Sequence, residues 1–321
     1  MSISMIPWVG GKGNLLWIID LLAPISYDCF VDVFGGSGTV TLSRPPRPNC
    51  VEVYNDVNRD LVNLFKCARD RPLALVKELS YLPLHSREEF ENLCRFLEQE
   101  NFQENYLQEE MEIAREYFSP EESERLCRIL TDRAELGDVK RAAAYFRKQR
   151  ESYNGGGRVF AGKPVDVTRF FRLIWDCSRR LKDVVLECRD FSPLTCQYDK
   201  PDTFFYCDPP YFEAEKFYDA LFTREDHLRL HEVLSQRKGY VMVSYNCCEF
   251  IRELYQDFFI FHTKRPNSMS HEEGAMYEEY VMTNYDPNAF AAQISLFGMT
   301  ASEKKKEFTL IHAPETILKN E

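Results

Sequence analysis

The chain has 321 residues with a formal net charge of −11, and 44% of them are apolar, which suits one large domain or one domain with an inserted module. Mean hydropathy is −0.41 and no stretch reaches the roughly 20 apolar residues of a membrane span, so the sequence predicts a soluble protein. The first residues lack the basic and apolar build of a secretory signal, and the sequence predicts a cytoplasmic protein. The eleven cysteines form no C-x-x-C pair, which favours reduced thiols and predicts no metal site.

The charge is distributed unevenly along the chain. Residues 86–138 hold 16 acidic and 6 basic residues, whereas residues 140–183 hold 12 basic and 4 acidic ones. An acidic protein argues against a DNA partner, because DNA-binding proteins usually carry a basic face. A local positive field can nevertheless bind phosphates, so the second segment is open to two interpretations, a phosphate-binding surface or an ordinary solvated helix face.

The predicted elements begin with alternating strands and helices. An apolar run at 29–33 leads into a glycine turn at 34–38, and a second strand at 49–54 ends before a helix at 59–69. Strand, glycine turn and helix in this order are typical of the first crossover of a doubly wound sheet. We therefore expect an α/β fold with a parallel sheet and helices on its faces.

The middle of the chain differs in character. Residues 86–138 are rich in glutamate and have apolar residues at helical spacing, and the basic segment that follows ends in a glycine-rich loop at 153–158. After Pro164 the sheet pattern resumes, with a helix at 168–182, strands at 184–188, 203–207 and 240–244, a helix at 224–236 capped by Thr223, and a closing antiparallel pair at 258–263 and 280–283. The sequence thus predicts one α/β domain interrupted by a mainly helical insertion at about 85–165.

One short motif points to the chemistry. The strand at 203–207 leads directly into Asp208, Pro209, Pro210 and Tyr211, and the carboxyl ends of parallel strands are where such sheets bind ligands. These residues suit methylation of the exocyclic amine of adenine, which is a poor nucleophile. The Asp208 carboxylate and the Pro209 carbonyl would accept both of its hydrogens and aim its lone pair at a methyl donor. Tyr211 would stack on the base, although the same four residues also fit a rigid turn.

Two further features suit a bound nucleoside. The glycine turn permits a close approach of the ligand, but many nucleotide-binding proteins share it. Asp56 follows the next strand and suits a pair of ribose hydroxyls, the alternative being a helix N-cap. The segment from Trp8 to Lys12 offers an aromatic face and an ammonium, but it lacks the Ser or Thr of a phosphate-binding loop.

Taken in order, five motifs resemble the Dam-type family of DNA adenine methyltransferases. They are Trp8-Val9-Gly10-Gly11-Lys12, the run from Asp32 to Gly38, the run from Asn55 to Leu61, Asp190-Phe191, and the Asp-Pro-Pro-Tyr motif at 208–211. The resemblance covers about residues 6–286 and implies a Rossmann-like, S-adenosylmethionine-dependent methyltransferase sheet. It further implies a catalytic domain at 1–84 and 166–297, an inserted target-recognition domain at 85–165, and a C-terminal tail at 298–321.

The resemblance also implies an activity, namely site-specific methylation of the N6 amine of a flipped adenine in double-stranded DNA. The implied catalytic residues are Asp208, Pro209, Pro210 and Tyr211. For S-adenosylmethionine, the implied binding residues are Trp8, Lys12, Asp32, Phe34, Gly35, Asp56, Asp190, Phe191 and Asp208. DNA contacts are expected at Lys140, Arg147, Asn154, Arg158 and Asn246, the last of these in a loop at 244–246 beside the target base.

The resemblance is incomplete, and several alternatives stay open. The loop at 153–158 reads Tyr-Asn-Gly-Gly-Gly-Arg where the family has Phe-Asn-Gly and then an arginine, so the recognised sequence is not implied, nor is the oligomeric state or a phage, restriction-modification or orphan role. A cytosine ring methylase would need a nucleophilic cysteine, usually after proline, and the chain has no Pro-Cys pair. An amine methylase acting on cytosine, RNA or a protein glutamine, and a non-catalytic binding relic, are the remaining alternatives. His227 and His231 lie four residues apart on a predicted helix, where we expect a solvated face and not a metal pair.

Overall fold

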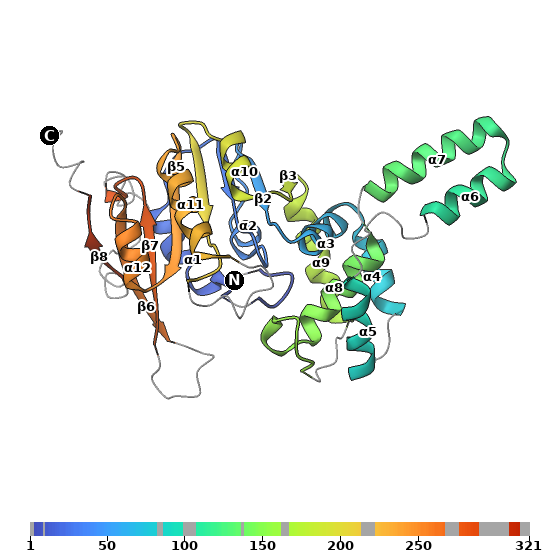
Figure 1. Cartoon of the computed structure of the whole chain (residues 1–321), viewed down its shortest axis with the longest axis horizontal. Coiled ribbons are helices and arrows are strands. Elements are labelled where there is room, and N and C mark those ends of the chain that lie inside the picture. The colour runs from blue at the N-terminus through green and yellow to red at the C-terminus, as the bar shows by residue number, and fades with distance from the viewer. Residues whose placement is uncertain are drawn as a thin grey trace. The chain divides into compact units, whose positions relative to one another are not determined.

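The computed structural model divides into two compact units, shown together in Figure 1. It describes residues 3–8, 10–81, 86–98, 107–135, 138–161, 167–212, 222–266, 276–288 and 308–314. The first unit comprises Met1–Ile3, Gly11–Val57 and Glu187–Glu321, and the second comprises Ser4–Gly10 and Asn58–Leu186. Among the described residues, no helix is both long and apolar enough to cross a membrane.

The first unit is built on a mixed sheet. Its parallel strands are β1 (Cys29–Asp32), β2 (Val51–Asn55), β4 (Thr203–Cys207) and β5 (Tyr240–Asn246), with β1 between β2 and β4. The antiparallel strands are β6 (Phe259–Pro266), β7 (Met276–Thr283) and β8 (Phe308–His312). With β3 (Val184–Glu187), of which only Glu187 belongs to the first unit, the strand order is β3-β2-β1-β4-β5-β7-β6-β8. The predicted parallel sheet and closing antiparallel pair are confirmed.

Helices cover both faces of this sheet because successive residues of each strand point to opposite sides. On one face, Phe30 and Phe204 pack with Ile18 of α1 (Leu16–Leu22). On the other face, Val31 and Phe205 pack with the helices of the second half of the chain. The remaining helices of the unit are η1 (Lys12–Asn14), α2 (Thr39–Ser43), α10 (Phe191–Gln197), α11 (Arg224–Ser235) and α12 (Glu249–Leu254). The predicted Rossmann-like α/β architecture is therefore confirmed.

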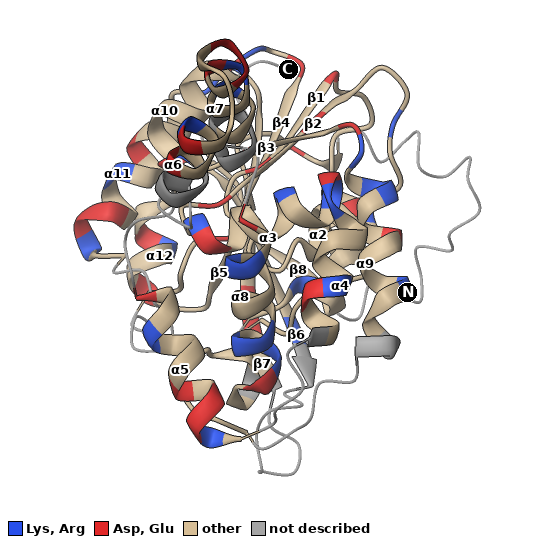
Figure 2. Ribbon diagram, turned by 90° about the vertical axis from the view of Figure 1, so that its right-hand side faces the viewer, with Lys and Arg blue, Asp and Glu red and all other residues tan. Residues whose placement is uncertain are grey.

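The second unit is helical around a central helix, α8 (Val139–Glu151). Its other helices are α3 (Arg59–Asp70), α4 (Pro72–Tyr81), α5 (Arg87–Leu97), α6 (Leu107–Tyr117), α7 (Pro120–Glu135), η2 (Tyr153–Gly155) and α9 (Val167–Leu181). The α8 run of Ala142, Ala143 and Ala144 is buried, and small side chains let α3, α4 and α5 pack closely on it. α6 packs on α7, and Figure 2 marks the acidic residues of α5 in red and the basic residues of α8 in blue.

The compact units have different bounds from the predicted domains. The predicted catalytic domain includes helices α3, α4 and α9, but these belong to the second unit because α3 and α4 pack on α8 and α9 packs on both of them. Arg141 pairs with Asp60, and Asn63 bonds the backbone of Asp138 in both directions. The predicted tail at 298–321 is not separate from the sheet, since β8 pairs with β6 and Phe308 contacts Phe261.

Candidate active site

Asp208 follows the last residue of β4 and stands at the carboxyl end of the parallel strands. One of its carboxylate oxygens accepts a hydrogen bond from the Ser244 hydroxyl at 3.0 Å, and the other lies 2.8 Å from the Lys12 ammonium. The Tyr206 hydroxyl lies within hydrogen-bonding distance of the Ser244 hydroxyl, at 3.0 Å. Burial raises the pKa of Asp208, and the neighbouring Lys12 ammonium opposes that rise. The carboxylate is therefore held in one orientation by two donors.

Tyr211 is oriented by a residue that the sequence analysis did not single out. Its hydroxyl donates to the Glu279 carboxylate at 2.5 Å, and only 3% of Tyr211 is exposed. The Lys12 ammonium lies 4.8 Å from the centroid of the Tyr211 ring and 3.9 Å from Glu279. That face of the ring is covered by Lys12 in this conformation, so a stacked base would need Lys12 to move. Between Asp208 and Tyr211, Pro209 is buried and Pro210 is half-buried.

The glycine turn after β1 is required by packing. A side chain at Gly35 would place its Cβ 2.1 Å from the Tyr54 ring. Asp32, the last residue of β1, is buried and accepts a hydrogen bond from the Thr41 hydroxyl at 2.7 Å. Burial raises the pKa of Asp32 to about 7, although the Thr41 bond counteracts this. Phe34 lies half-buried beside this acid at the start of the turn.

Asp56 lies at the end of β2, and its carboxylate accepts a hydrogen bond from the Gly36 amide at 3.0 Å. The alternative interpretation of Asp56 as the N-cap of the following helix is wrong. Asn58 caps α3, since its side chain accepts from the Leu61 amide. Asp56 therefore tethers the glycine turn to the neighbouring strand end, beside the buried Asp32.

Asp190 and Phe191 begin α10, and the Asp190 side chain is already engaged. It accepts two hydrogen bonds from the Arg229 guanidinium at 2.8 and 2.9 Å and caps the helix through the Ser192 amide. These bonds lower the pKa of Asp190, the Arg229 bond contributing most. Phe191 is 4% exposed and packs with Phe34, their ring centroids 5.8 Å apart. The pair therefore offers an aromatic wall, while the Asp190 carboxylate serves mainly to hold α10.

The segment at 244–246 is the end of β5 and not a loop, which corrects that expectation. Asn246 pairs with Glu279 in the register of β5 and β7. Its amide nitrogen donates to the Phe212 carbonyl at 3.2 Å, whereas its side-chain oxygen is buried and has no hydrogen-bond partner among the described residues. Tyr245, between Ser244 and Asn246, is fully buried.

The other four predicted DNA contacts all lie in the second unit, and the structure contradicts one of them. Arg147 is 3% exposed and pairs with Glu151 at 2.7 Å, so its guanidinium does not lie on a surface that a phosphate could reach. Lys140 and Arg158 are exposed. Asn154 lies in η2, but its side chain is outside the described residues. Trp8, which was predicted to bind the cofactor, is half-buried and also belongs to the second unit.

The prediction of a solvated face for both histidines of α11 is wrong for His227. This residue is fully buried, and its Nδ1 lies 2.7 Å from the Tyr245 hydroxyl. Burial lowers the pKa of His227 to about 4, so the imidazole is neutral at pH 7. His231 pairs instead with Asp257 at 2.7 Å.

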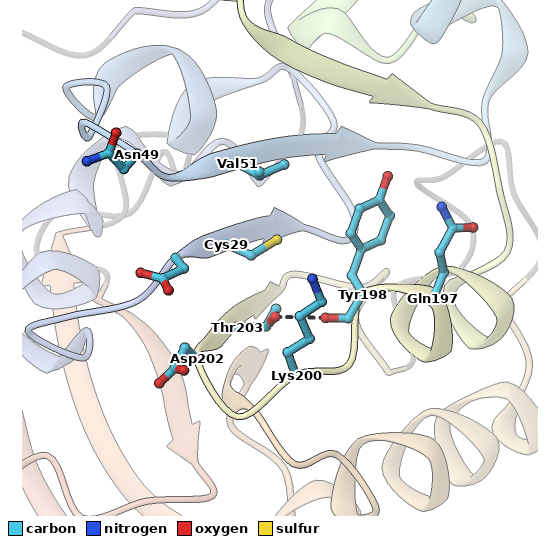
Figure 3. Close-up of a pocket in the computed structure, with 9 residues that line it drawn as sticks. Cys29, Asn49, Val51, Gln197, Tyr198, Lys200, Asp202 and Thr203 are labelled. Atoms are coloured by element: carbon cyan, nitrogen blue, oxygen red, sulfur yellow. Dashed lines mark hydrogen bonds between the residues drawn. The ribbon is translucent and has the colours of Figure 1, made fainter.

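A cavity of about 460 Å³ lies at the opposite end of the strands (Figure 3). Cys29, Val51 and Thr203, which line it, are the first residues of β1, β2 and β4. Asp208 follows the last residue of β4, so this cavity is not the site at the carboxyl ends. Ligands of open α/β sheets bind at the carboxyl ends, and we assign the cavity no part in the chemistry.

Parallel strands with acidic residues at the carboxyl ends of β1, β2 and β4 are typical of α/β enzymes that bind a nucleoside-containing ligand at this edge of the sheet. The family model of D12 class N6 adenine-specific DNA methyltransferases matches residues 8–270, and the chain belongs to this family. A relative, the type II methyltransferase M1.LlaDCHI of Lactococcus lactis subsp. cremoris, is 28% identical over 300 residues, which cover 87% of this chain and 94% of the relative. The predicted family and activity, methylation of adenine in DNA, are thereby confirmed.

Proposed function

We propose that this enzyme uses S-adenosylmethionine as its methyl donor and that Asp208 holds the target adenine amine during transfer. The observation that carries the proposal is the orientation of the Asp208 carboxylate. It lies at the carboxyl end of β4, where Lys12 and Ser244 each hold one of its oxygens. Because Ser244 holds one oxygen of the carboxylate, the group keeps its orientation when its other oxygen accepts the amine, and this preorganisation lowers the barrier.

The residues around the glycine turn fit the donor. The backbone at Gly35 runs tightly against Tyr54, Asp56 stands at the end of the adjacent strand, and Phe34 and Phe191 form an aromatic wall that suits an adenine ring. The buried acid Asp32 favours a cation electrostatically, whereas the half-buried Asp208 is engaged with Lys12. When bound, S-adenosylmethionine supplies a methyl group carried on a positively charged sulfur.

The chain's own residues then handle the amine. Asp208 accepts one amine hydrogen and the Pro209 carbonyl accepts the other, which turns the nitrogen lone pair toward the methyl group. Transfer of the methyl group would break its bond to the donor sulfur, which would leave as a neutral thioether, and the positive charge would pass to the amine, which must then lose one proton. Because burial raises the pKa of Asp208, its carboxylate is suited to accept that proton and release it to solvent afterwards.

The DNA target is proposed to be double-stranded, with the adenine flipped out of the helix to reach Asp208. The second unit supplies exposed basic residues, Lys140 and Arg158, that suit phosphate contacts, and we propose it as the target-recognition domain. By analogy with its relative, we propose a role as a modification enzyme of a type II system. A DNA substrate is in keeping with the predicted cytoplasmic location.

The proposal is tested by incubating wild type and Asp208→Ala with labelled S-adenosylmethionine and, separately, unmethylated DNA, RNA or a glutamine-containing release factor. We expect label on adenine in DNA for wild type, and at least about a thousandfold less for Asp208→Ala because the amine loses its acceptor. Donor binding, measured by calorimetry, should survive the substitution. Label on cytosine, RNA or protein, or full activity of Asp208→Ala, would contradict the proposal. Single-molecule sequencing of the methylated DNA would then identify the recognised sequence.

A further inference from the structure

Glu279 is a buried acid in the first unit to which the chemistry described above gives no role. It lies on β7, is fully buried, and faces the same side of the sheet as the apolar Val281. Burying a carboxylate among apolar side chains is costly unless other groups pair with it. An apolar residue would serve the strand better, so a carboxylate at this position calls for a functional reason.

The contacts of Glu279 lead directly to the Asp-Pro-Pro-Tyr motif. It accepts the Tyr211 hydroxyl hydrogen bond at 2.5 Å, and the Lys12 ammonium lies 3.9 Å away. The same ammonium is 2.8 Å from Asp208 and 4.8 Å from the centroid of the Tyr211 ring. Lys12 is thus shared by two acids, and its ammonium lies about 1 Å closer to Asp208 than to Glu279.

This arrangement conflicts with methyl transfer unless Lys12 moves. The target amine needs the Asp208 carboxylate, and the base needs the Tyr211 face that Lys12 now covers. The amine also gains positive charge as it is methylated, and an ammonium on the same carboxylate would oppose that charge. A second acid close to Lys12 removes the conflict, because the ammonium can shift toward it without losing its counter-ion.

We propose that Glu279 is a positioning residue that holds the Tyr211 hydroxyl and receives the Lys12 ammonium when the target amine binds Asp208. The inference rests on the proposed function of Asp208. In the resting state Lys12 neutralises Asp208 and covers the Tyr211 ring. With the base present, Lys12 pairs with Glu279, and both Asp208 and the ring become available to the adenine.

The chain provides a matched control for the test. Glu278 precedes Glu279 on the same strand but points to the opposite face, where it pairs with Lys264 at 2.7 Å. Glu279→Gln keeps the shape and an oxygen for the Tyr211 hydroxyl but removes the charge that receives Lys12, whereas Glu278→Gln removes an equal charge elsewhere. Single-turnover methylation of unmethylated DNA should be about ten- to a hundredfold slower in Glu279→Gln and within about twofold of wild type in Glu278→Gln. Equal rates for the two variants would overturn the inference.

The pH profile of the single-turnover rate separates positioning from a merely structural defect. Asp208 faces Lys12, Glu279, Ser244, Tyr206, Tyr211 and the more distant Asp32. The Glu279 charge raises the pKa of Asp208, so its removal should move the acid limb of the rate profile to lower pH. Loss of packing alone would slow the reaction equally at every pH, and an unmoved limb would contradict the proposal.

Two further variants keep the result decisive. Tyr211→Phe removes the hydroxyl that contacts Glu279, and combining it with Glu279→Gln should slow the reaction little more than the slower single variant, since both disrupt one unit. If Glu279→Gln does not fold, as judged by thermal melting, a wild-type rate for Tyr211→Phe would overturn the inference.

Asp208→Ala distinguishes failure of the Glu279 role from failure of the proposed function. If it is inactive while Glu279→Gln matches its control, only the role of Glu279 fails, but if it is active the proposed function fails as well.

Discussion

At the scale of single residues, Asp32 shows how burial changes the chemistry of an acid. Its pKa is raised to about 7 because desolvation outweighs the hydrogen bond from Thr41. A folded-state pKa above the unfolded value means that the folded protein binds the extra proton, so this contribution to stability is greatest below the unfolded pKa near 3.8 and is lost as the pH rises through 7.

Replacing Asp32 with asparagine should remove the loss of stability that occurs as the pH rises through 7. We expect the unfolding free energy of Asp32→Asn relative to wild type to rise by about 2 to 3 kcal/mol between pH 5 and pH 8, from about 1.4 kcal/mol per pKa unit. The affinity for S-adenosylmethionine should fall at the same time, because a charge beside the proposed donor is lost. Urea denaturation at the two pH values, together with calorimetric titration, measures both effects. A difference in stability that does not change with pH would show that Asp32 does not titrate in this range.

At the scale of elements, helix α11 begins with a complete capping box. The Thr223 hydroxyl accepts from the Asp226 amide, and the Asp226 carboxylate accepts from the Thr223 amide at 2.9 Å. We expect Thr223→Ala to lower the unfolding free energy by about 1 kcal/mol, because the Asp226 amide at the first turn loses its partner. Ser235→Ala, at the exposed end of the same helix, is the control and should stay within about 0.5 kcal/mol of wild type in urea denaturation.

The same helix carries the buried His227, whose titration acts in the opposite direction from that of Asp32. Its pKa is lowered to about 4 by burial, so the unfolded chain binds the proton more readily. The stability contributed by the neutral imidazole is present above pH 6.5 and is lost as the pH falls toward 4, by up to about 3 kcal/mol. His227→Phe should flatten this part of the pH dependence in chemical denaturation. An equal loss of stability in the variant would assign the acid sensitivity to other groups.

At the scale of the whole molecule, the protein carries a net charge of −11, so its binding of DNA must depend on local groups of basic residues. The structure removes some of the basic residues of the segment at 140–183 from that role. Arg141 pairs with Asp60 and Arg147 with Glu151, and both are buried, so they serve folding. Lys140 and Arg158 are exposed and keep the proposed role.

The double variant Lys140→Ala/Arg158→Ala should therefore bind DNA several-fold more weakly. Each lost phosphate contact lowers the slope of log affinity against log salt by about 0.9, so the slope should fall by about 1 to 2. Arg115→Ala, an exposed base on the acidic helix α6, is the control and should leave the slope unchanged. Fluorescence anisotropy with labelled duplex DNA at several salt concentrations measures the slopes, and parallel slopes for the three proteins would exclude these two residues from the interface.

Short sequence patterns alone predicted several strands and a helix cap of this protein. The run at 203–207 is β4, the strands on either side of the glycine turn are β1 and β2, and Thr223 caps α11. These predictions succeed because strand alternation, glycine turns and caps depend on neighbours a few residues away in the chain. The order of the motifs was sufficient to indicate a DNA adenine methyltransferase, because four of the five motifs lie at the ends of β1, β2, β3 and β4 of the same sheet.

Only the tertiary structure decided which charged residues meet. Glu279 lies 71 positions after Asp208 in the sequence and contacts Tyr211 because β5 brings β7 to the end of the parallel strands. Arg147 could not be distinguished by sequence from an exposed base, since its burial depends on how α8 packs. Pairing and burial depend on contacts between distant segments, which composition and periodicity do not encode. The sequence thus determined the class of chemistry and predicted Asp208 as the residue at its centre, while the fold decided how Lys12, Glu279 and Tyr211 are arranged around Asp208.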